Sequence, residues 1–294
     1  MPTARNGDIE LAYELVGGAP GEPILLVCGN FTQMIHWPDQ LLEGLAARGF
    51  QAVRFDNRDS GRSTHCDDGR RYTLRDMAND AVAVMDALDW SSAHIFGPSL
   101  GGMIGQVMAV HHPDRVRSLT SISATPAWKL RVIRPRLRNA LKVVAVAATP
   151  ATDKEAAIEK TMRMFRLMTT PQYPLDEPWL RMMTARAYDI ADDSRGGMRQ
   201  QAAAKASGDR RHELAQVQAP TLVVHGEQDP MQSARAGRAT AQAIPGARLR
   251  ILPHVGHVIP PQCWPQILDD LADLLRHTQY ADQRHHRTPN AAAE

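Results

Sequence analysis

The stretch that decides the fold is Ala93-His94-Ile95-Phe96-Gly97-Pro98-Ser99-Leu100-Gly101-Gly102. The apolar run 93–96 ends at a Gly-x-Ser-x-Gly motif, and apolar residues at helical spacing continue to about His111. The motif's glycines let a strand and a helix approach closely, so that Ser99 can occupy a strained turn above a sheet. Pro98 biases Gly97 toward extended geometry, which suits the end of a strand. The sequence therefore predicts strand, sharp turn and helix, with Ser99 as the candidate nucleophile.

Short β-branched runs of the same kind recur between helix-like stretches. This alternation is typical of a mostly parallel sheet that is flanked by helices. Residues 24–27 are apolar throughout, as in a strand buried on both faces, whereas residues 248–252 alternate and suit an edge strand. The remaining predicted strands are 9–15, which we expect to be antiparallel, 51–55, 119–122 and 221–224.

The strand signals stop between about residues 126 and 207, where several helical stretches follow one another. We expect this part to be a helical cap, inserted after the sixth strand and lying over the carboxyl edge of the sheet. The predicted organisation is a core built from residues 1–125 and 208–279, a cap of residues 126–207, and a polar, disordered tail of residues 280–294.

Composition excludes several classes of function. The formal net charge of +2 arises from 34 basic and 32 acidic residues that are scattered along the 294-residue chain, which argues against a nucleic-acid partner. No segment has the apolar length needed for a signal peptide or a membrane span, so we expect no membrane partner. Three widely spaced cysteines suggest neither a disulfide framework nor a zinc site, which favours a cytoplasmic location.

A serine hydroxyl needs a neighbouring base to take its proton, and a third group must orient that base. When the serine lies on such a turn, the acid and then the histidine follow it along the chain. Asp229 comes after the predicted strand 221–224, at the sheet edge where ligand chemistry collects. His257 follows a glycine that lets its loop turn inward. We interpret these two as acid and base, with Glu227 and His254 as their rivals.

The motifs together resemble those of the α/β-hydrolase superfamily. Besides the serine motif, the resemblance rests on Gly226-Glu227-Gln228-Asp229-Pro230, on Gly256-His257 and on Asp56-Asn57-Arg58-Asp59-Ser60-Gly61-Arg62-Ser63. Within the superfamily, the chain is most similar to the aclacinomycin methylesterase-like esterases of actinobacteria, over nearly its whole length. It departs from them at Val258, where members often have Asp, and in the loop Cys28-Gly29-Asn30-Phe31.

This resemblance implies an α/β-hydrolase fold with a mostly parallel, eight-stranded sheet. It also implies an oxyanion hole formed by the backbone N–H of Leu100 and by the loop after the third strand, where we expect the N–H of Asn30 to be the second donor. We expect Phe31, Pro98, Trp128 and Val258 to line the substrate pocket. No P-loop, dinucleotide motif or metal cluster accompanies these residues, so we expect no cofactor and no metal.

The expected function is the hydrolysis of a small-molecule carboxylic ester through an acyl-enzyme on Ser99. A methyl ester of a bulky apolar or polyketide-like compound is one candidate, because the predicted cap is rich in methionine and aromatic residues. A cofactor-free perhydrolase or haloperoxidase and a carbon–carbon bond hydrolase would use the same three residues. A ligand-binding protein without turnover is a further alternative. The sequence does not predict an oligomeric state.

Overall fold

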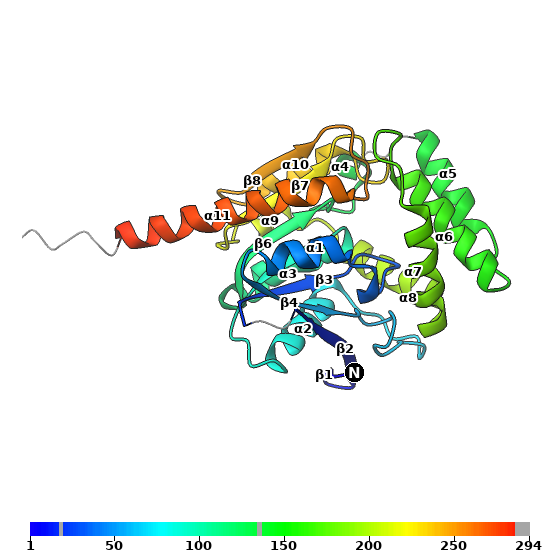
Figure 1. Cartoon of the computed structure of the whole chain (residues 1–294), viewed down its shortest axis with the longest axis horizontal. Helices are drawn as coiled ribbons and strands as arrows, with labels where there is room; N and C mark the ends of the chain where they lie inside the picture. The colour runs from blue at the N-terminus through cyan, green and yellow to red at the C-terminus, as the bar shows by residue number, and fades with distance from the viewer. Residues whose placement is uncertain (18–19, 134–136, 286–294) are drawn as a thin grey trace, which may run out of the picture.

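The computed structural model describes residues 1–17, 20–133 and 137–285. In this part of the chain, eight strands form one sheet in the order β1-β2-β4-β3-β5-β6-β7-β8 (Figure 1). The strands are β1 (Thr3–Asn6), β2 (Ile9–Val16), β3 (Glu22–Val27), β4 (Phe50–Phe55), β5 (Ala93–Pro98), β6 (Val116–Ile122), β7 (Thr221–Gly226) and β8 (Arg248–Leu252).

The pairing confirms the mostly parallel sheet of an α/β-hydrolase fold. Strands β3 to β8 run parallel, while β2 is antiparallel to both β1 and β4. Strand β8 lies at an edge of the sheet, as its alternating pattern predicted. The short polar strand β1 was not predicted, because its four residues carry no hydrophobic pattern and it forms only by pairing with β2.

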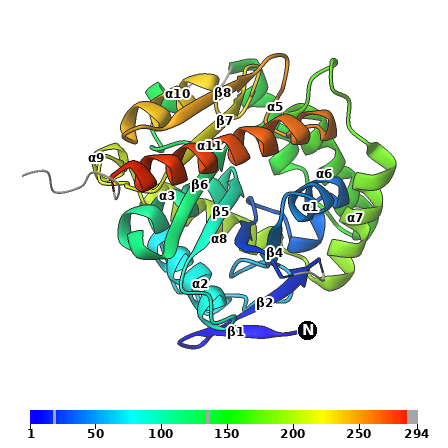
Figure 2. The same ribbon diagram turned by 60° about the vertical axis from the view of Figure 1, so that its left-hand side comes forward.

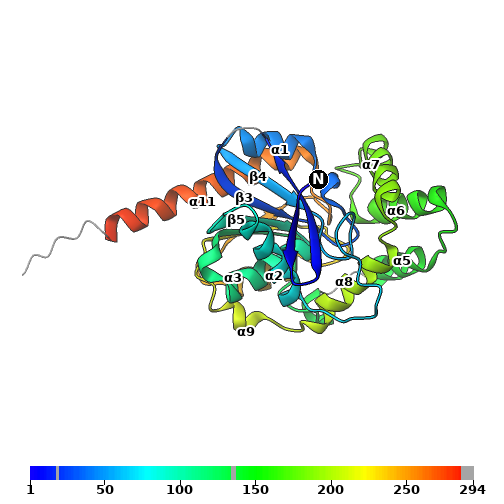
Figure 3. The same cartoon turned by 90° about the horizontal axis from the view of Figure 1, so that it is seen from below.

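Helices cover both faces of the sheet (Figures 2 and 3). Helices α1 (Asp39–Ala46) and α11 (Trp264–His285) pack on one face, and α2 (Leu74–Asp86), α3 (Leu100–His111) and α10 (Ala234–Ala243) pack on the other. Helix α3 is buried from Leu100 to Ala109, so it has no polar face to turn toward solvent. Helix α2 begins where Thr73 and Asp76 form a capping box.

Between β6 and β7 the described residues contribute no strand to the sheet, and their helices are α4 (Leu130–Ile133), α5 (Leu137–Ala148), α6 (Lys154–Met168), α7 (Glu177–Ile190), α8 (Ser194–Ala206) and α9 (Arg211–Leu214). Helices α5 to α8 lie together at one end of the sheet (Figure 1). Contacts of α6 to α8 with the loops that follow β3, β4 and β8 show that this end is the carboxyl edge.

The C-terminal prediction needs a correction. Helix α11 continues through His285, so the disorder that we predicted from residue 280 is wrong for residues 280–285; residues 286–294 lie outside the described part. A polar composition did not prevent the last turns from extending a helix whose first half is buried on the sheet. None of the described helices is long and apolar enough to cross a membrane.

Candidate active site

Ser99 occupies a sharp turn between β5 and α3. Its φ of 52° and ψ of −114° lie outside the regions that side chains normally allow. The Ser99 N–H donates to the Ile122 carbonyl at 2.7 Å, and its own carbonyl accepts from the Met103 N–H at 3.1 Å. These bonds hold a strained backbone between a strand and a helix, as the sequence predicted, and the strain itself points to a functional role.

The glycines of the serine motif are required by close backbone packing. A Cβ atom on Gly97 would lie 2.4 Å from the Gly101 carbonyl carbon. A Cβ atom on Gly101 would lie 2.0 Å from the Val27 carbonyl oxygen. Any side chain at either position would therefore separate α3 from β3 and β5 and would open the turn that carries Ser99.

Asp229 and His257 meet at the same edge of the sheet, after β7 and β8. The His257 Nδ1 atom lies 2.7 Å from the Asp229 Oδ2 atom. Because an ionised carboxylate only accepts, this contact assigns the proton to Nδ1 and leaves Nε2 free to act as a base. In the described part of the chain, no hydrogen bond joins the Ser99 hydroxyl to the His257 ring; such bonds often tighten only when substrate is bound.

The site favours ionised Asp229. Burial alone would raise the pKa of this carboxyl, but the His257 charge and the hydrogen bonds from His225 and His257 hold its pKa well below the usual range. For His257, burial lowers the pKa, while the charge and hydrogen bond of Asp229 raise it by more, so the net shift is upward. The pair is therefore arranged to stabilise a positive imidazolium beside a negative carboxylate.

The two rival residues lie together at the surface, apart from this pair. His254 is exposed, and its N–H donates to the Glu227 carboxylate at 3.3 Å. Its ring lies 3.3 Å from the Gln228 side chain. The geometry thus distinguishes the pair Asp229 and His257 from the rival pair Glu227 and His254. From the sequence, this choice rested only on the expected positions of the residues in their loops.

The predicted oxyanion loop lies against the serine turn. A Cβ atom on Gly29 would lie 3.5 Å from the Pro98 carbonyl oxygen and 3.9 Å from the Ser99 Cβ atom. Among the described residues, no group accepts a hydrogen bond from the backbone N–H of Asn30 or Leu100. Both donors are therefore available, as an oxyanion hole requires.

The four predicted pocket residues have different surroundings. Phe31 is 49% exposed and has a φ of 58°. Its ring packs closely on Gly197 of α8, where a Cβ atom would lie only 2.1 Å from a ring carbon. Pro98 ends β5 beside Ser99, and the Val258 N–H donates to the Met168 carbonyl at 3.3 Å. Trp128 packs against the buried cluster on the α2 and α3 side of the sheet.

The end of α6 contacts the loop that carries His257, which the sequence analysis did not find. The Met168 carbonyl accepts from the His257 N–H at 2.7 Å, and the Thr170 hydroxyl donates to the His254 carbonyl at 2.6 Å. A Cβ atom on Gly256 would lie 2.3 Å from the Met168 carbonyl oxygen. We call this contact between residues 168–170 and 254–258 the His-loop seam. Backbone contacts between distant segments leave no side-chain signal in a sequence.

A second contact, which we call the Asp193 latch, joins the start of α8 to the core. The Asp193 carboxylate accepts from the Gln33 side chain at 2.8 Å, from the Ser60 hydroxyl at 3.2 Å and from the Gly61 N–H at 3.1 Å. His65 lies 3.8 Å away. Ser60 and Gly61 of the Asp56–Ser63 segment thus receive the latch.

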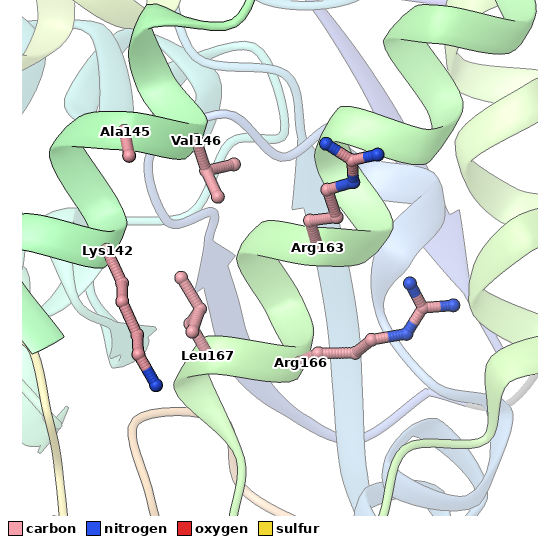
Figure 4. Close-up of a pocket in the computed structure, with 6 residues that line it drawn as sticks. All are labelled: Lys142, Ala145, Val146, Arg163, Arg166 and Leu167. Carbon is pink, nitrogen blue, oxygen red and sulfur yellow. The ribbon is translucent and has the colours of Figure 1, made fainter.

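A hollow of about 360 Å³ opens between α5 and α6 and is lined by Lys142, Ala145, Val146, Arg163, Arg166 and Leu167 (Figure 4). Ser99, Asp229 and His257 are not among its lining residues. Met162, Phe165 and Trp179 pack α6 against α7. These residues of the predicted cap therefore stabilise the group of helices α5 to α8, which we call the helical layer. No group of three or more His, Cys, Asp or Glu side chains in the described ranges could hold a metal ion.

Comparison with known proteins agrees with this geometry. The family model described as alpha/beta hydrolase fold matches residues 22–262. A rhodomycin D methylesterase of Streptomyces peucetius is 29% identical over 286 residues, covering 88% of this chain and 93% of that protein. A 3-oxoadipate enol-lactonase of Acinetobacter baylyi is 25% identical over 270 residues, covering 89% and 92%.

A solved structure extends the likeness to the fold. The enol-lactonase from Burkholderia xenovorans superposes with a TM-score of 0.72 at 24% identity, covering 94% of this chain and 100% of that one. The family match spans both sides of the helical insertion and includes Ser99, Asp229 and His257. The chain therefore belongs to the alpha/beta hydrolase fold family.

Proposed function

We propose that this protein hydrolyses a carboxylic ester through an acyl-enzyme on Ser99. The observation that carries the proposal is the 2.7 Å contact between His257 Nδ1 and Asp229 Oδ2, at the sheet edge where Ser99 sits on its strained turn. An oriented base and a nucleophile on a sharp strand-to-helix turn are the parts that acyl transfer requires.

The reaction proceeds in two steps. Ser99 Oγ attacks the ester carbonyl carbon while His257 Nε2 takes the hydroxyl proton, and the N–H groups of Leu100 and Asn30 bind the oxyanion. Collapse breaks the bond to the alcohol, which leaves with the proton from His257. Water then attacks the acyl carbon while His257 takes its proton. The bond to Ser99 Oγ breaks, His257 returns the proton to Oγ, and the carboxylic acid leaves.

The substrate class follows from the relatives and from the surroundings of Ser99. Two relatives are named for cleaving a methyl ester and an enol-lactone, both of which are carboxylic esters. We expect Phe31, Pro98 and Val258 to supply apolar groups to the pocket, because they belong to the oxyanion loop, the serine turn and the His257 loop. We assign a small-molecule ester with a bulky apolar acyl group, a methyl ester being the first candidate. Trp128 belongs to the proposal on its sequence position alone.

The proposed setting is the cytoplasm, which suits the three buried, free cysteines. No cofactor enters the proposed reaction. The proposed partner of the site is the small-molecule ester. We propose no nucleic-acid partner, because the 34 basic and 32 acidic residues are balanced and scattered along the sequence.

The test is the hydrolysis of methyl and p-nitrophenyl esters with acyl groups of increasing size. We expect Ser99→Ala to lower kcat by about 10⁴-fold or more, and mass spectrometry to find the acyl group on Ser99 of the wild type. Ser91→Ala, at an exposed serine outside the site, is the matched control. A stable complex that releases neither acid nor alcohol would instead favour a binding protein.

A further inference from the structure

His225 is a second histidine at Asp229, and the reaction as described does not use it. It lies within β7 and is fully buried. Its Nε2 atom is 2.7 Å from the Gln232 carbonyl oxygen and 3.3 Å from Asp229 Oδ2. A carbonyl oxygen only accepts, so the proton of the ring is assigned to Nε2. This N–H donates to Gln232, and Asp229 Oδ2 lies within reach of the same nitrogen.

The hydrogen bonds to Asp229 divide between its two oxygens. Oδ1 accepts from the backbone N–H groups of Met231 and Gln232, both at 2.8 Å. Oδ2 accepts from the Nδ1–H of His257 and lies 3.3 Å from the Nε2 atom of His225. The backbone donors therefore fix one oxygen within its own turn. The position of the other oxygen, which faces the catalytic base, depends on the two imidazole rings.

The ring of His225 is held in place by its neighbours. A Cβ atom on Gly237 of α10 would lie 2.7 Å from the His225 Cβ atom and 2.8 Å from its Nδ1 atom. Helix α10 thus packs directly on the ring and prevents it from turning away. In the described part of the chain, Nδ1 has no hydrogen-bond partner. A buried, unpaired nitrogen is unfavourable, so packing alone does not account for a histidine here.

We propose that His225 is a positioning residue of the reaction, whose Nε2–H holds Oδ2 of Asp229 in line with the Nδ1–H of His257. It acts through Asp229 and touches no substrate. The inference rests on the proposed function, because it gives Asp229 the role of orienting the base. It adds a fourth side chain to the Ser99, His257 and Asp229 arrangement.

Removing the donor has two consequences. Oδ2 keeps only one hydrogen bond, so its charge acts more strongly on His257 and should raise the pKa of that ring. The carboxylate is also less restrained, so the base is less well oriented. Both effects should be absent when the replacement side chain can still donate to Oδ2. A purely structural role would change stability without changing the titration of His257.

The experiment compares His225→Leu, which has no donor, with His225→Gln, whose amide can donate. His94→Gln is the matched control, because His94 is also buried on a central strand but contacts Ser118. We would measure kcat and KM against pH with p-nitrophenyl butyrate. We expect His225→Leu to lower kcat about tenfold and to raise the acid-limb pKa by about half a unit. His225→Gln should restore most of both, and His94→Gln should match the wild type.

A folded His225→Leu variant with an unchanged acid limb, or with one moved to lower pH, would overturn the proposal. Nitrogen-15 NMR of the wild-type chain provides a test that needs neither a variant nor turnover. We expect the Nε2–H tautomer for His225; the Nδ1–H tautomer would overturn the inference. If the wild type cleaves no ester, or Ser99→Ala remains active, the proposed function fails, while the tautomer still shows whether Nε2 of His225 carries the proton that the inference requires.

Discussion

Two of the contacts between the helical layer and the core differ in chemistry. At the His-loop seam, the Met168 carbonyl accepts backbone N–H groups from His257 and Val258, and no charge is involved. At the Asp193 latch, a carboxylate accepts from Gln33, Ser60 and Gly61 in a partly enclosed place. The first contact holds the loop of the proposed base, and the second holds the loops beside Asn30, the proposed oxyanion donor.

The difference teaches how each side of the site can be changed. Backbone bonds at the His-loop seam are insensitive to most substitutions but cannot tolerate a new atom at Gly256. The latch depends on one side chain and on its charge, so it responds to substitution and to pH. We therefore expect the seam to control activity and the latch to control stability.

The largest effect should come from Gly256→Ala. Its Cβ atom would lie 2.3 Å from the Met168 carbonyl oxygen, so the loop must move and take His257 with it. We expect kcat/KM for ester hydrolysis to fall by about 10²-fold or more, as a displacement of about 1 Å can cause. Gly44→Ala is the control, because its Cβ atom would meet only the flexible tips of Leu268 and Arg48. If the two variants were equally active, the contact at Gly256 would not be needed to position His257.

A smaller effect is expected at the latch. Asp193→Ala leaves the donors of Gln33, Ser60 and Gly61 without their charged acceptor and should lower the free energy of unfolding by about 2 kcal/mol. The exposed neighbour provides the control, and Asp192→Ala should change it by less than about 0.5 kcal/mol. Urea unfolding would measure both. If the two variants are equally stable, the latch does not hold the helical layer.

The smallest effect concerns pH. Burial, with a smaller contribution from the nearby Asp193 charge, raises the pKa of Asp56 to about 6, against the hydrogen bonds from the Met34 and Arg62 N–H groups. The folded state therefore binds this proton more tightly than the unfolded chain, whose carboxyl titrates near 3.8. The stability that protonated Asp56 contributes is fully present below its pKa in the unfolded chain and is lost as the pH rises through its folded-state pKa of about 6.

Asp56→Asn removes this titration. Both proteins would be unfolded in urea at about pH 4.5 and about pH 7. The variant should lose less stability across that interval than the wild type, by on the order of 1 kcal/mol. Asp192→Asn, an exposed carboxyl, should follow the wild type. If the stability of Asp56→Asn and of the wild type changes with pH in the same way, the pKa of Asp56 is not raised in the folded protein.

Much of the fold could be predicted because its signals are local. The apolar run of β3 and the alternation of β8 reflect burial on two faces and on one face of a sheet. The serine turn could be predicted because glycines at 97 and 101 are required by backbone contacts of 2.0–2.4 Å. Strand β1 and the last turns of α11 were missed, since each depends on a neighbour rather than on its own pattern.

The sequence by itself determined the family, the sheet, and the order of Ser99, Asp229 and His257 along the chain. Only the tertiary structure decided that Asp229 contacts His257 while Glu227 contacts His254, because loops of similar composition differ in where their ends are anchored. It also placed Met168, Asp193 and His225 around the site. The partners of Met168 and Asp193 lie on distant segments of the chain, and His225 comes close to Asp229 only because the turn after β7 folds back on the strand. Such contacts arise from packing in three dimensions, which no spacing along one chain records.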